Sequence, residues 1–225
     1  MSAGNAPAPW VDTTVAANGR QVRENFDDWF GASKVHDADN LPMVVYHGTH
    51  PWEHEDGRSL GDVTSFDRMA SVKIVRRKPS IDTVGTWFST NAGAGGAGMY
   101  GSAIYPVYLA IESPHVTTFS LMLRRARLLH NGKDDGRMIG ALEVEAYRTW
   151  LQAIGKDGIK IVHDEGSGSD EFRQQDAWIA LEPTQIKSAI GNSGLYQHGP
   201  SLCDDLAEFE AEAETHAAEH QRMRA

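Results

Sequence analysis

Short runs of β-branched and aromatic residues, several with glycine or proline at an edge, constrain the fold of this chain more than any other feature. Such runs are typical of β-strands. They outnumber the helical segments of the central chain, and most of the links between them are too short for regular βαβ crossovers, so they predict an α+β domain. The runs are MVVYH (43–47), GTWFST (85–90), IYPVYLAI (104–111), GIKIVH (158–163) and DAWIALEP (176–183).

Two segments carry helical periodicity instead. In RQVRENFDDWFG, apolar side chains recur on one helical face and Gly31 is placed to end the helix, which predicts a helix over residues 20–30. In ALEVEAYRTWLQAIG a second apolar face is expected, with Gly155 as the cap. The first face comprises Val22, Phe26, Trp29 and Phe30, and the second comprises Leu142, Tyr147, Trp150, Leu151 and Ile154.

Composition narrows the class of protein. The chain has 225 residues, of which 40% are hydrophobic and 23% are charged, as in soluble globular proteins. No segment reaches the roughly 18 to 20 apolar residues that span a bilayer, and the N-terminal sequence lacks signal-peptide features, so a cytoplasmic location is expected. The formal net charge of −10 argues against a large nucleic-acid-binding surface.

The chain divides by composition into three parts. Residues 1–19 are rich in Ala, Pro, Gly and Asn and are expected to form a mobile leader. Residues 20–199 form the predicted domain, in which PTQIKSAIGN (183–192) is interpreted as a strand and turn that closes the sheet. Residues 200–225 predict an acidic helical tail, which is either exposed or available to a partner.

Three familiar chemistries do not fit this sequence. GAGGAG (93–98) matches a dinucleotide-binding glycine pattern, but a predicted strand follows it instead of a helix. HGTHPWEHE (47–55) contains three histidines, but Pro51 breaks any helix that would align them, so no metal site is expected. The single Cys203 precedes two aspartates, which disfavour a thiolate, and the G-x-S-x-G motif is absent.

The run LPMVVYHGTH (41–50) ends in an unusual way for a buried strand. Its apolar residues lead into His47 and then Gly48. Burying an imidazole is costly unless both ring nitrogens have partners, and glycine removes a side chain where something approaches the backbone. The pair therefore predicts a ligand at the end of this strand.

Four segments stand in a fixed order along the chain: FDDWFGASKVHDADNLPMVVYHGT, GTWFST, AIYPVYLAIESP and AWIALEPTQIKSAIGNSGLY. Together they resemble the ADP-ribosyltransferase-like domains of phage and mobile-element polyvalent proteins, over about residues 25–196. These domains are related to the poly(ADP-ribose) polymerase and diphtheria-toxin group. The resemblance implies an α+β fold in which a split β-sheet clamp with flanking helices holds NAD in an extended shape.

The resemblance also implies an NAD site. His47 would hydrogen-bond a hydroxyl of the adenosine ribose, and the backbone of Gly48 would pair with the nicotinamide carboxamide. Tyr100 would stack on the nicotinamide ring. Trp87 matches an aromatic position of the family, and Ala97 stands where relatives have a small or hydroxyl residue. The implied NAD-binding set is His47, Gly48, Thr49, Trp87, Ser89, Ala97 and Tyr100.

The implied reaction is cleavage of the nicotinamide–ribose bond through an oxocarbenium-like transition state that an acidic residue stabilises. The chain departs from the family here, because the usual glutamate position falls on Ala177. Since neighbouring strand residues point to opposite faces, Asp176 can replace that glutamate only if it shares a face with His47. The candidates for the catalytic role are Asp176 or Gln175, followed by Glu171 and Asp170 on the preceding loop.

Two classes of function follow. The first is an NAD-dependent mono-ADP-ribosyltransferase of phage origin that acts in the bacterial cytoplasm. Its macromolecular acceptor is expected to be a host protein rather than nucleic acid, given the negative charge. The second is a noncatalytic binding module of the same fold, or an NAD glycohydrolase in which water replaces the acceptor. Neither class requires a metal or a membrane.

Overall fold

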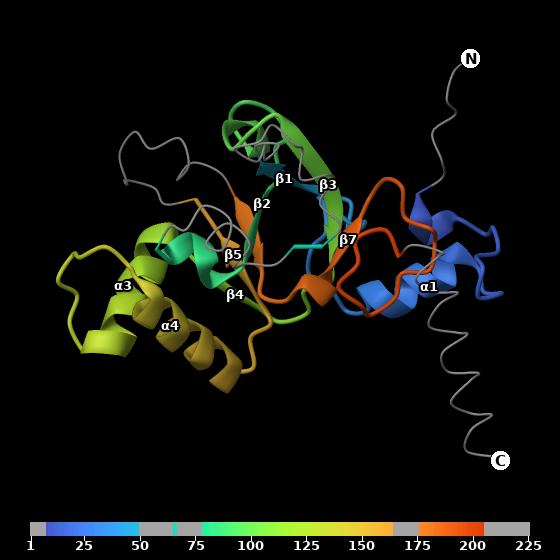
Figure 1. Cartoon of the computed structure of the whole chain (residues 1–225). Helices are drawn as coiled ribbons and strands as arrows, with labels where there is room; N and C mark the ends of the chain where they lie inside the picture. The colour runs from blue at the N-terminus through green and yellow to red at the C-terminus, as the bar shows by residue number, and fades with distance from the viewer. Residues whose placement is uncertain (1–7, 50–64, 67–77, 164–175, 205–225) are drawn as a thin grey trace, which may run out of the picture.

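A seven-stranded mixed sheet organises the part of the chain that the structure describes (Figure 1). The structure is a computed structural model, and it describes residues 8–49, 65–66, 78–163 and 176–204. The strand order is β4-β5-β6-β2-β1-β3-β7, and of these neighbours only β4 and β5 run parallel. The strands are β1 Val45–Thr49, β2 Thr86–Ser89, β3 Ala103–Leu109, β4 Pro114–Thr117, β5 Gly158–Ile161, β6 Ala177–Ala180 and β7 Ile186–Ser188.

Three α-helices accompany the sheet in the described residues: α1 Val22–Phe30, α3 Phe119–Asn131 and α4 Ala141–Ala153. Their ends follow local chemistry. The Glu24 carboxylate accepts a hydrogen bond from the Gln21 backbone N–H at the start of α1 (3.2 Å), and Gly31 ends that helix at φ 54°. Thr118 caps α3, and Gly132 ends it at φ 67°. None of the described helices is long and apolar enough to cross a membrane.

The two faces of the sheet have different covers. α3 and α4 lie side by side against one face, where Ile159, Ile161 and Ile179 belong to the core that they cover (Figure 1). The alternate residues of the same strands belong to a second core on the other face, with Phe88, Trp178 and the residues Val35, Val45 and Ile186 among its members. This division follows from the two-residue period of a strand, because neighbouring side chains point to opposite faces.

A third, aromatic core joins α1 to β3. Phe26 packs against Tyr108 and Tyr196, with ring centroids 5.2 and 5.0 Å apart. Trp10 also contacts Phe26 and Tyr108, and it lies in a short 3-10 helix, η1 (Pro9–Val11). Within the described residues, regular structure therefore begins at Pro9.

The secondary structure confirms most sequence predictions. The five predicted strand runs form β1, β2, β3, β5 and β6, the PTQIKSAIGN segment supplies β7, and the two predicted helices are α1 and α4. The glycine segment is followed by β3, as expected, with the short 3-10 helix η3 (Ala97–Met99) between them. β4 and α3 were not predicted, and the proposed tail helix lies outside the described residues apart from its first positions.

The predicted apolar face of α4 was partly wrong. Leu142 and Ile154 are exposed, whereas the helix buries Val144 and Arg148 in addition to the expected tyrosine and leucine. Arg148 can be buried because its guanidinium donates hydrogen bonds to the Leu181 carbonyl (3.2 Å) and to the Glu182 carboxylate (2.8 Å). Both acceptors belong to the segment that follows β6, so the periodicity of α4 could not predict that Arg148 would be buried.

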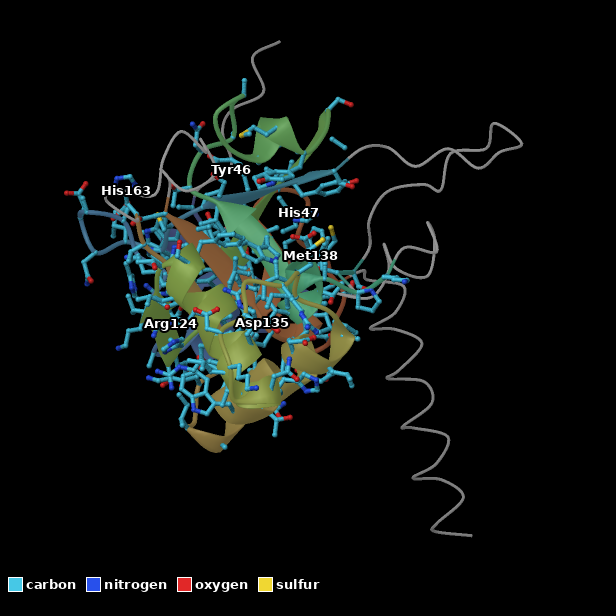
Figure 2. All side chains as sticks on the ribbon, turned by 90° about the vertical axis from the view of Figure 1, so that its left-hand side faces the viewer. Tyr46, His47, Arg124, Asp135, Met138 and His163 are labelled. Atoms are coloured by element: carbon cyan, nitrogen blue, oxygen red, sulfur yellow. The ribbon has the colours of Figure 1, made fainter. Side chains whose placement is uncertain are left out.

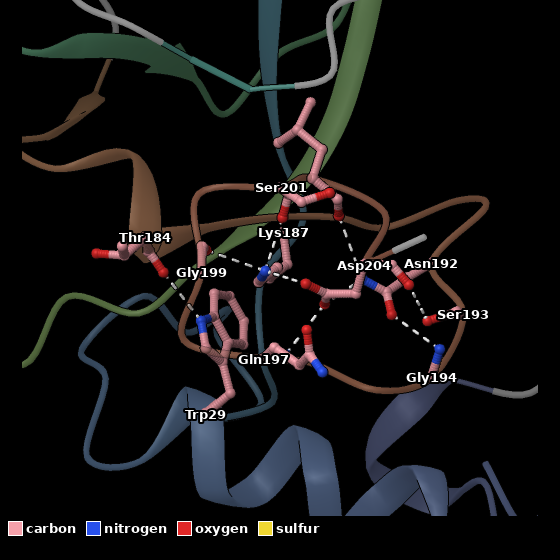
Figure 3. Close-up of polar contacts among 11 residues, drawn as sticks. Trp29, Thr184, Lys187, Asn192, Ser193, Gly194, Gln197, Gly199, Ser201 and Asp204 are labelled. Atoms are coloured by element: carbon pink, nitrogen blue, oxygen red, sulfur yellow. Dashed lines mark hydrogen bonds and ion pairs between the residues drawn. The ribbon is translucent and has the colours of Figure 1, made fainter. Parts of the chain in front are cut away.

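A buried ion pair fastens the chain after β7 (Figure 3). The side chains of Lys187 and Asp204 are 0% and 1% exposed and are in direct contact. Lys187 also donates to the carbonyl oxygens of Gly199 (3.2 Å) and Ser201 (2.6 Å). The second carboxylate oxygen of Asp204 accepts from the Gln197 backbone (3.1 Å). The loop of residues 189–204 is therefore held to the edge of the sheet by charge-assisted hydrogen bonds.

Removing one member of this pair should destabilise the fold strongly, because the other charge is left buried without compensation. We expect Lys187→Met to lower the free energy of unfolding by about 3 to 5 kcal/mol in urea denaturation. Asp28→Ala is the control, since its ion pair with Arg20 is exposed and should contribute less than about 1 kcal/mol. Equal losses in the two variants would contradict this account, whereas partial recovery in a Lys187→Met/Asp204→Asn double variant would support it.

Candidate functional site

His47 is the middle residue of β1, which continues to Thr49, and it is held in a defined tautomer. Its Nδ1 lies 2.8 Å from the backbone carbonyl oxygen of Trp87 on β2. Because a carbonyl can only accept a hydrogen bond, Nδ1 carries the proton and Nε2 keeps the lone pair of the neutral ring. Burial lowers the pKa of His47 below its ordinary value of 6.5, and the hydrogen bond to Trp87 opposes that shift only in part. The ring is therefore a neutral hydrogen-bond acceptor at pH 7.

The face that carries His47 forms a row across the sheet. The rings of His47 and Phe88 are 5.7 Å apart on adjacent strands, Phe88 is opposite Trp178 on β6, and Trp178 is opposite Lys160 on β5. Phe66 packs on His47, with ring centroids 4.7 Å apart. Adjacent strands are about 4.8 Å apart, so the row runs roughly 14 Å from His47 to Lys160.

Asp176 stands immediately before β6, two residues ahead of Trp178, whose side chain is on the face that carries His47. Extending the alternation of β6 by one residue would direct Asp176 to that face. An ion pair of 4.0 Å between Asp176 and Lys160, which is itself on that face, agrees with this direction. The choice of Asp176 as the catalytic residue stays a prediction.

The opposite face carries the glycine segment. Tyr46 and His47 are neighbours on β1 and are labelled in Figure 2, and Tyr46 is opposite Ser89 on β2. Gly48 follows on the side of Tyr46, and a Cβ at this position would lie 1.7 Å from the carbonyl oxygen of Ala97. The missing side chain of Gly48 thus makes room for the backbone of η3. This packing contact accounts for the glycine without any ligand.

A second glycine allows the same segment to lie close to the sheet. A Cβ on Gly96 would meet the Asn91 carbonyl oxygen at 2.0 Å and the Ser89 hydroxyl at 2.7 Å. The Ser89 hydroxyl accepts a hydrogen bond from the Asn91 backbone N–H (3.0 Å), and the Ala97 N–H donates to the Asn91 carbonyl (2.8 Å). Residues 89–97 are therefore folded back as a tight turn at the end of β2.

A pocket opens where this turn meets the start of β6. Ser89 is the last residue of β2 and is paired with Ala177, the first residue of β6. The lining residues are Ser89, Gly95, Gly96, Met99, Tyr100, Asp176 and Ala177. The pocket thus brings together four of the predicted positions from segments far apart in the sequence. They are Ser89, Tyr100, Asp176 and Ala177, the position at which the family has its glutamate.

Tyr100 presents a neutral phenol at this pocket. Its side chain is partly exposed, and burial together with the charge of Asp82 raises its pKa to about 12. The phenol therefore stays protonated at pH 7. A partly exposed neutral ring beside a pocket is able to stack on a flat ligand.

The other predicted residues lie elsewhere. Trp87 points to the helix-covered face, where its ring packs against Phe119 at 6.1 Å, so it does not share a face with His47. Thr49 ends β1 opposite Ala103. Gln175, Glu171 and Asp170 lie outside the described residues, as do His50 and His54. Within the described ranges there is no group of three or more His, Cys, Asp or Glu side chains that could hold a metal ion.

Sequence reasoning missed three residues of this region: Phe88 as the neighbour of His47, Met99 on the pocket wall and Lys160 beside Asp176. Lys160 had a detectable signal. It stands between two buried isoleucines in GIKI, and alternation turns it to the face opposite theirs. Which residues meet it there depends on the strand order, which local sequence does not encode.

We expect Gly48→Ala to destabilise the protein, because a backbone carbonyl cannot move aside as easily as a side chain. The melting temperature should fall, with a loss of at least about 1 to 3 kcal/mol in the free energy of unfolding. Gly199→Ala is the matched control, since a Cβ there meets nothing within 4 Å. If thermal unfolding showed Gly48→Ala to be as stable as the control, the packing of Ala97 against β1 would be wrong.

The environment of His47 predicts a direction of pH dependence. Its folded pKa lies below 6.5, so the unfolded chain binds more protons below that pH and stability should fall as the pH drops from 6.5. ¹⁵N NMR of the imidazole should show the Nδ1–H tautomer at pH 7 and a midpoint below 6.5. The difference in stability between the wild type and His47→Gln should change only below that pH. A midpoint above 6.5 would contradict the buried, neutral assignment.

Comparison with protein families matches residues 37–196 to ADP-ribosyltransferases in polyvalent proteins. This range covers most of the chain and includes the whole seven-stranded sheet, the His47–Gly48 pair and the pocket. Searches among curated proteins and among solved structures each found no match. The resemblance in the sequence is thereby confirmed, and the α+β sheet has the fold expected of it. The chain belongs to the family of ADP-ribosyltransferases found in polyvalent proteins.

Proposed function

We propose that this domain is a mono-ADP-ribosyltransferase that uses NAD as its substrate and transfers ADP-ribose to a macromolecule. Family membership supports the class of reaction. The observation in this chain that best supports the proposal is the tautomer of His47. Because Nδ1 carries the proton, Nε2 is free to accept a hydrogen bond from a ribose hydroxyl. A charged imidazolium could not accept that hydrogen bond.

The pocket suits the nicotinamide end of the same substrate. Tyr100 offers a neutral ring for stacking, and the Ser89 hydroxyl and the backbone around Gly96 offer polar groups for a carboxamide. The backbone of Gly48 is enclosed by Ala97 on its glycine side. We therefore propose that the nicotinamide carboxamide is recognised by the backbone of residues 89–97, which covers Gly48, as well as by the backbone of Gly48.

Asp176 is our candidate for the catalytic acid. It lines the pocket beside Ala177, where the family places a glutamate, and it forms an ion pair with Lys160. During transfer the bond between the ribose C1′ and the nicotinamide nitrogen breaks, and the bonding electrons leave with nicotinamide. A carboxylate near C1′ would stabilise the positive charge that develops there, and the acceptor then bonds to C1′ and loses a proton.

The acceptor and the setting are parts of this proposal. A net charge of −10 favours a protein acceptor over nucleic acid, whose phosphates it would repel. Membership of a polyvalent-protein family favours a phage-derived effector that acts in the cytoplasm of a bacterial host. The competing function is a binding module or an NAD glycohydrolase, and the absence of glutamate at position 177 is the observation that favours it.

The proposal is tested with NAD labelled on its adenylate side, incubated with purified protein in buffer and in bacterial lysate. Wild-type protein should release nicotinamide and place label on protein in the lysate. Asp176→Asn should lower the rate of nicotinamide release by about 100-fold or more, the usual effect of losing a group that stabilises transition-state charge. His47→Ala should weaken NAD binding, which is measured separately by calorimetry.

Asp135→Asn is the matched control, because Asp135, labelled in Figure 2, is a surface aspartate in an ion pair with Arg137 (3.1 Å) on the α3–α4 connection and does not line the pocket. It should behave as wild type. Free ADP-ribose without labelled protein would indicate a glycohydrolase. NAD that stays intact in every sample, while a control transferase is active, would leave the binding module as the function.

A further inference from the structure

Lys160 is a cation inserted into an otherwise apolar strand. Its neighbours Ile159 and Ile161 are buried under α3 and α4, so strand alternation turns Lys160 to the face that carries His47. The pairing of β5 with β6 then places it directly opposite Trp178. The position of this ammonium group is set by the sheet register.

Trp178 gives Lys160 a rigid support. The indole is 2% exposed and belongs to the second core, so its ring has little freedom to move. The Lys160 ammonium lies 5.2 Å from the centre of that ring, within the range of a cation–π interaction. A long and flexible side chain is thereby given a preferred orientation along the sheet.

The same ammonium lies 4.0 Å from an oxygen of Asp176. This separation is too long for a direct hydrogen bond, so the contact is one of charge and leaves the lone pairs of the carboxylate available to a substrate. The side chains of Lys160 and Asp176 are 34% and 45% exposed. Asp176 immediately precedes β6. The next residue, Ala177, is the first of the strand, and its methyl group cannot form a hydrogen bond or an ion pair that would orient the Asp176 carboxylate.

We infer that Lys160 is the positioning residue of the proposed reaction: supported by Trp178, it holds the Asp176 carboxylate at the edge of the pocket. This inference rests on the proposed function and deepens it. It explains how an aspartate one residue away from the family position of the acid is kept in reach of the pocket. Lys160 acts on the orientation of Asp176 and does not contact the reacting atoms.

The test uses the full chain and measures nicotinamide release at a series of NAD concentrations for the wild type, Lys160→Met, Lys160→Arg and Asp176→Asn. Lys160→Met should lower kcat by about 2- to 5-fold, as expected for an exposed ion pair, with the KM for NAD unchanged. Lys160→Arg should restore most of the rate. In the Asp176→Asn background, Lys160→Met should have no further effect, because the group that it positions is absent.

Lys156→Met is the matched control. Lys156 precedes β5 and its ammonium donates a hydrogen bond to the Ser113 hydroxyl (3.3 Å), so its loss removes a lysine of the same region but leaves Asp176 untouched. Its kcat should equal that of the wild type. Thermal unfolding of every variant identifies any loss of rate that comes from loss of the fold.

Several results would overturn the inference. A raised KM with unchanged kcat in Lys160→Met would show that Lys160 binds the phosphates of NAD instead. An effect of the same size in the Asp176→Asn background would show that Lys160 acts independently of that carboxylate, and no effect at all would remove its role. If wild-type protein does not turn NAD over, the proposed function fails and this inference falls with it, whereas an active wild type with an unchanged Lys160→Met overturns the inference alone.

Discussion

The antiparallel pairing of β1, β2 and β6 is the interaction on which the candidate site depends. Tyr46 is opposite Ser89, and Ser89 is opposite Ala177, so the ends of three strands distant in the sequence meet at one place. Because a shift of one residue would exchange the faces of every side chain, this register decides which residues can act together. It places His47 on one face and Ser89 on the other, and the pocket at the strand ends is lined by Ser89, Ala177 and Asp176 but not by His47.

Close contact of backbone with backbone shapes the rest of the pocket. Gly48 and Gly96 have no side chain at the points where η3 and the turn after β2 press against the sheet. Interiors are packed at near-crystalline density, so an added methyl group in either place has no room. The glycine of the His47–Gly48 pair is therefore needed for the fold whether or not its backbone also contacts a ligand, and a variant there would report on both.

Stability and chemistry are separated in space. The Lys187–Asp204 pair and the aromatic cluster around Phe26 hold α1 and the loop of residues 189–204 to β3 and β7, at one end of the sheet order. Lys160 and Asp176 lie on β5 and just before β6, toward the other end. A buried charge pair is weak evidence for net stability, but breaking it is expensive. Variants in the two regions should therefore have separable effects on unfolding and on NAD.

The sequence by itself determined the α+β class, most of the strands and the approximate positions of α1 and α4, because periodicity, capping and turn chemistry act over a few residues. It did not reveal the burial of Arg148, the helix-facing direction of Trp87 or the place of Lys160. Each of these depends on partners from another element. Arg148 binds groups of the residues that follow β6, Trp87 packs against α3, and Lys160 is opposite Trp178 on the neighbouring strand. Local patterns show that a face is buried, but only the tertiary pairing of strands decides what it is buried against and which polar side chains meet at the pocket.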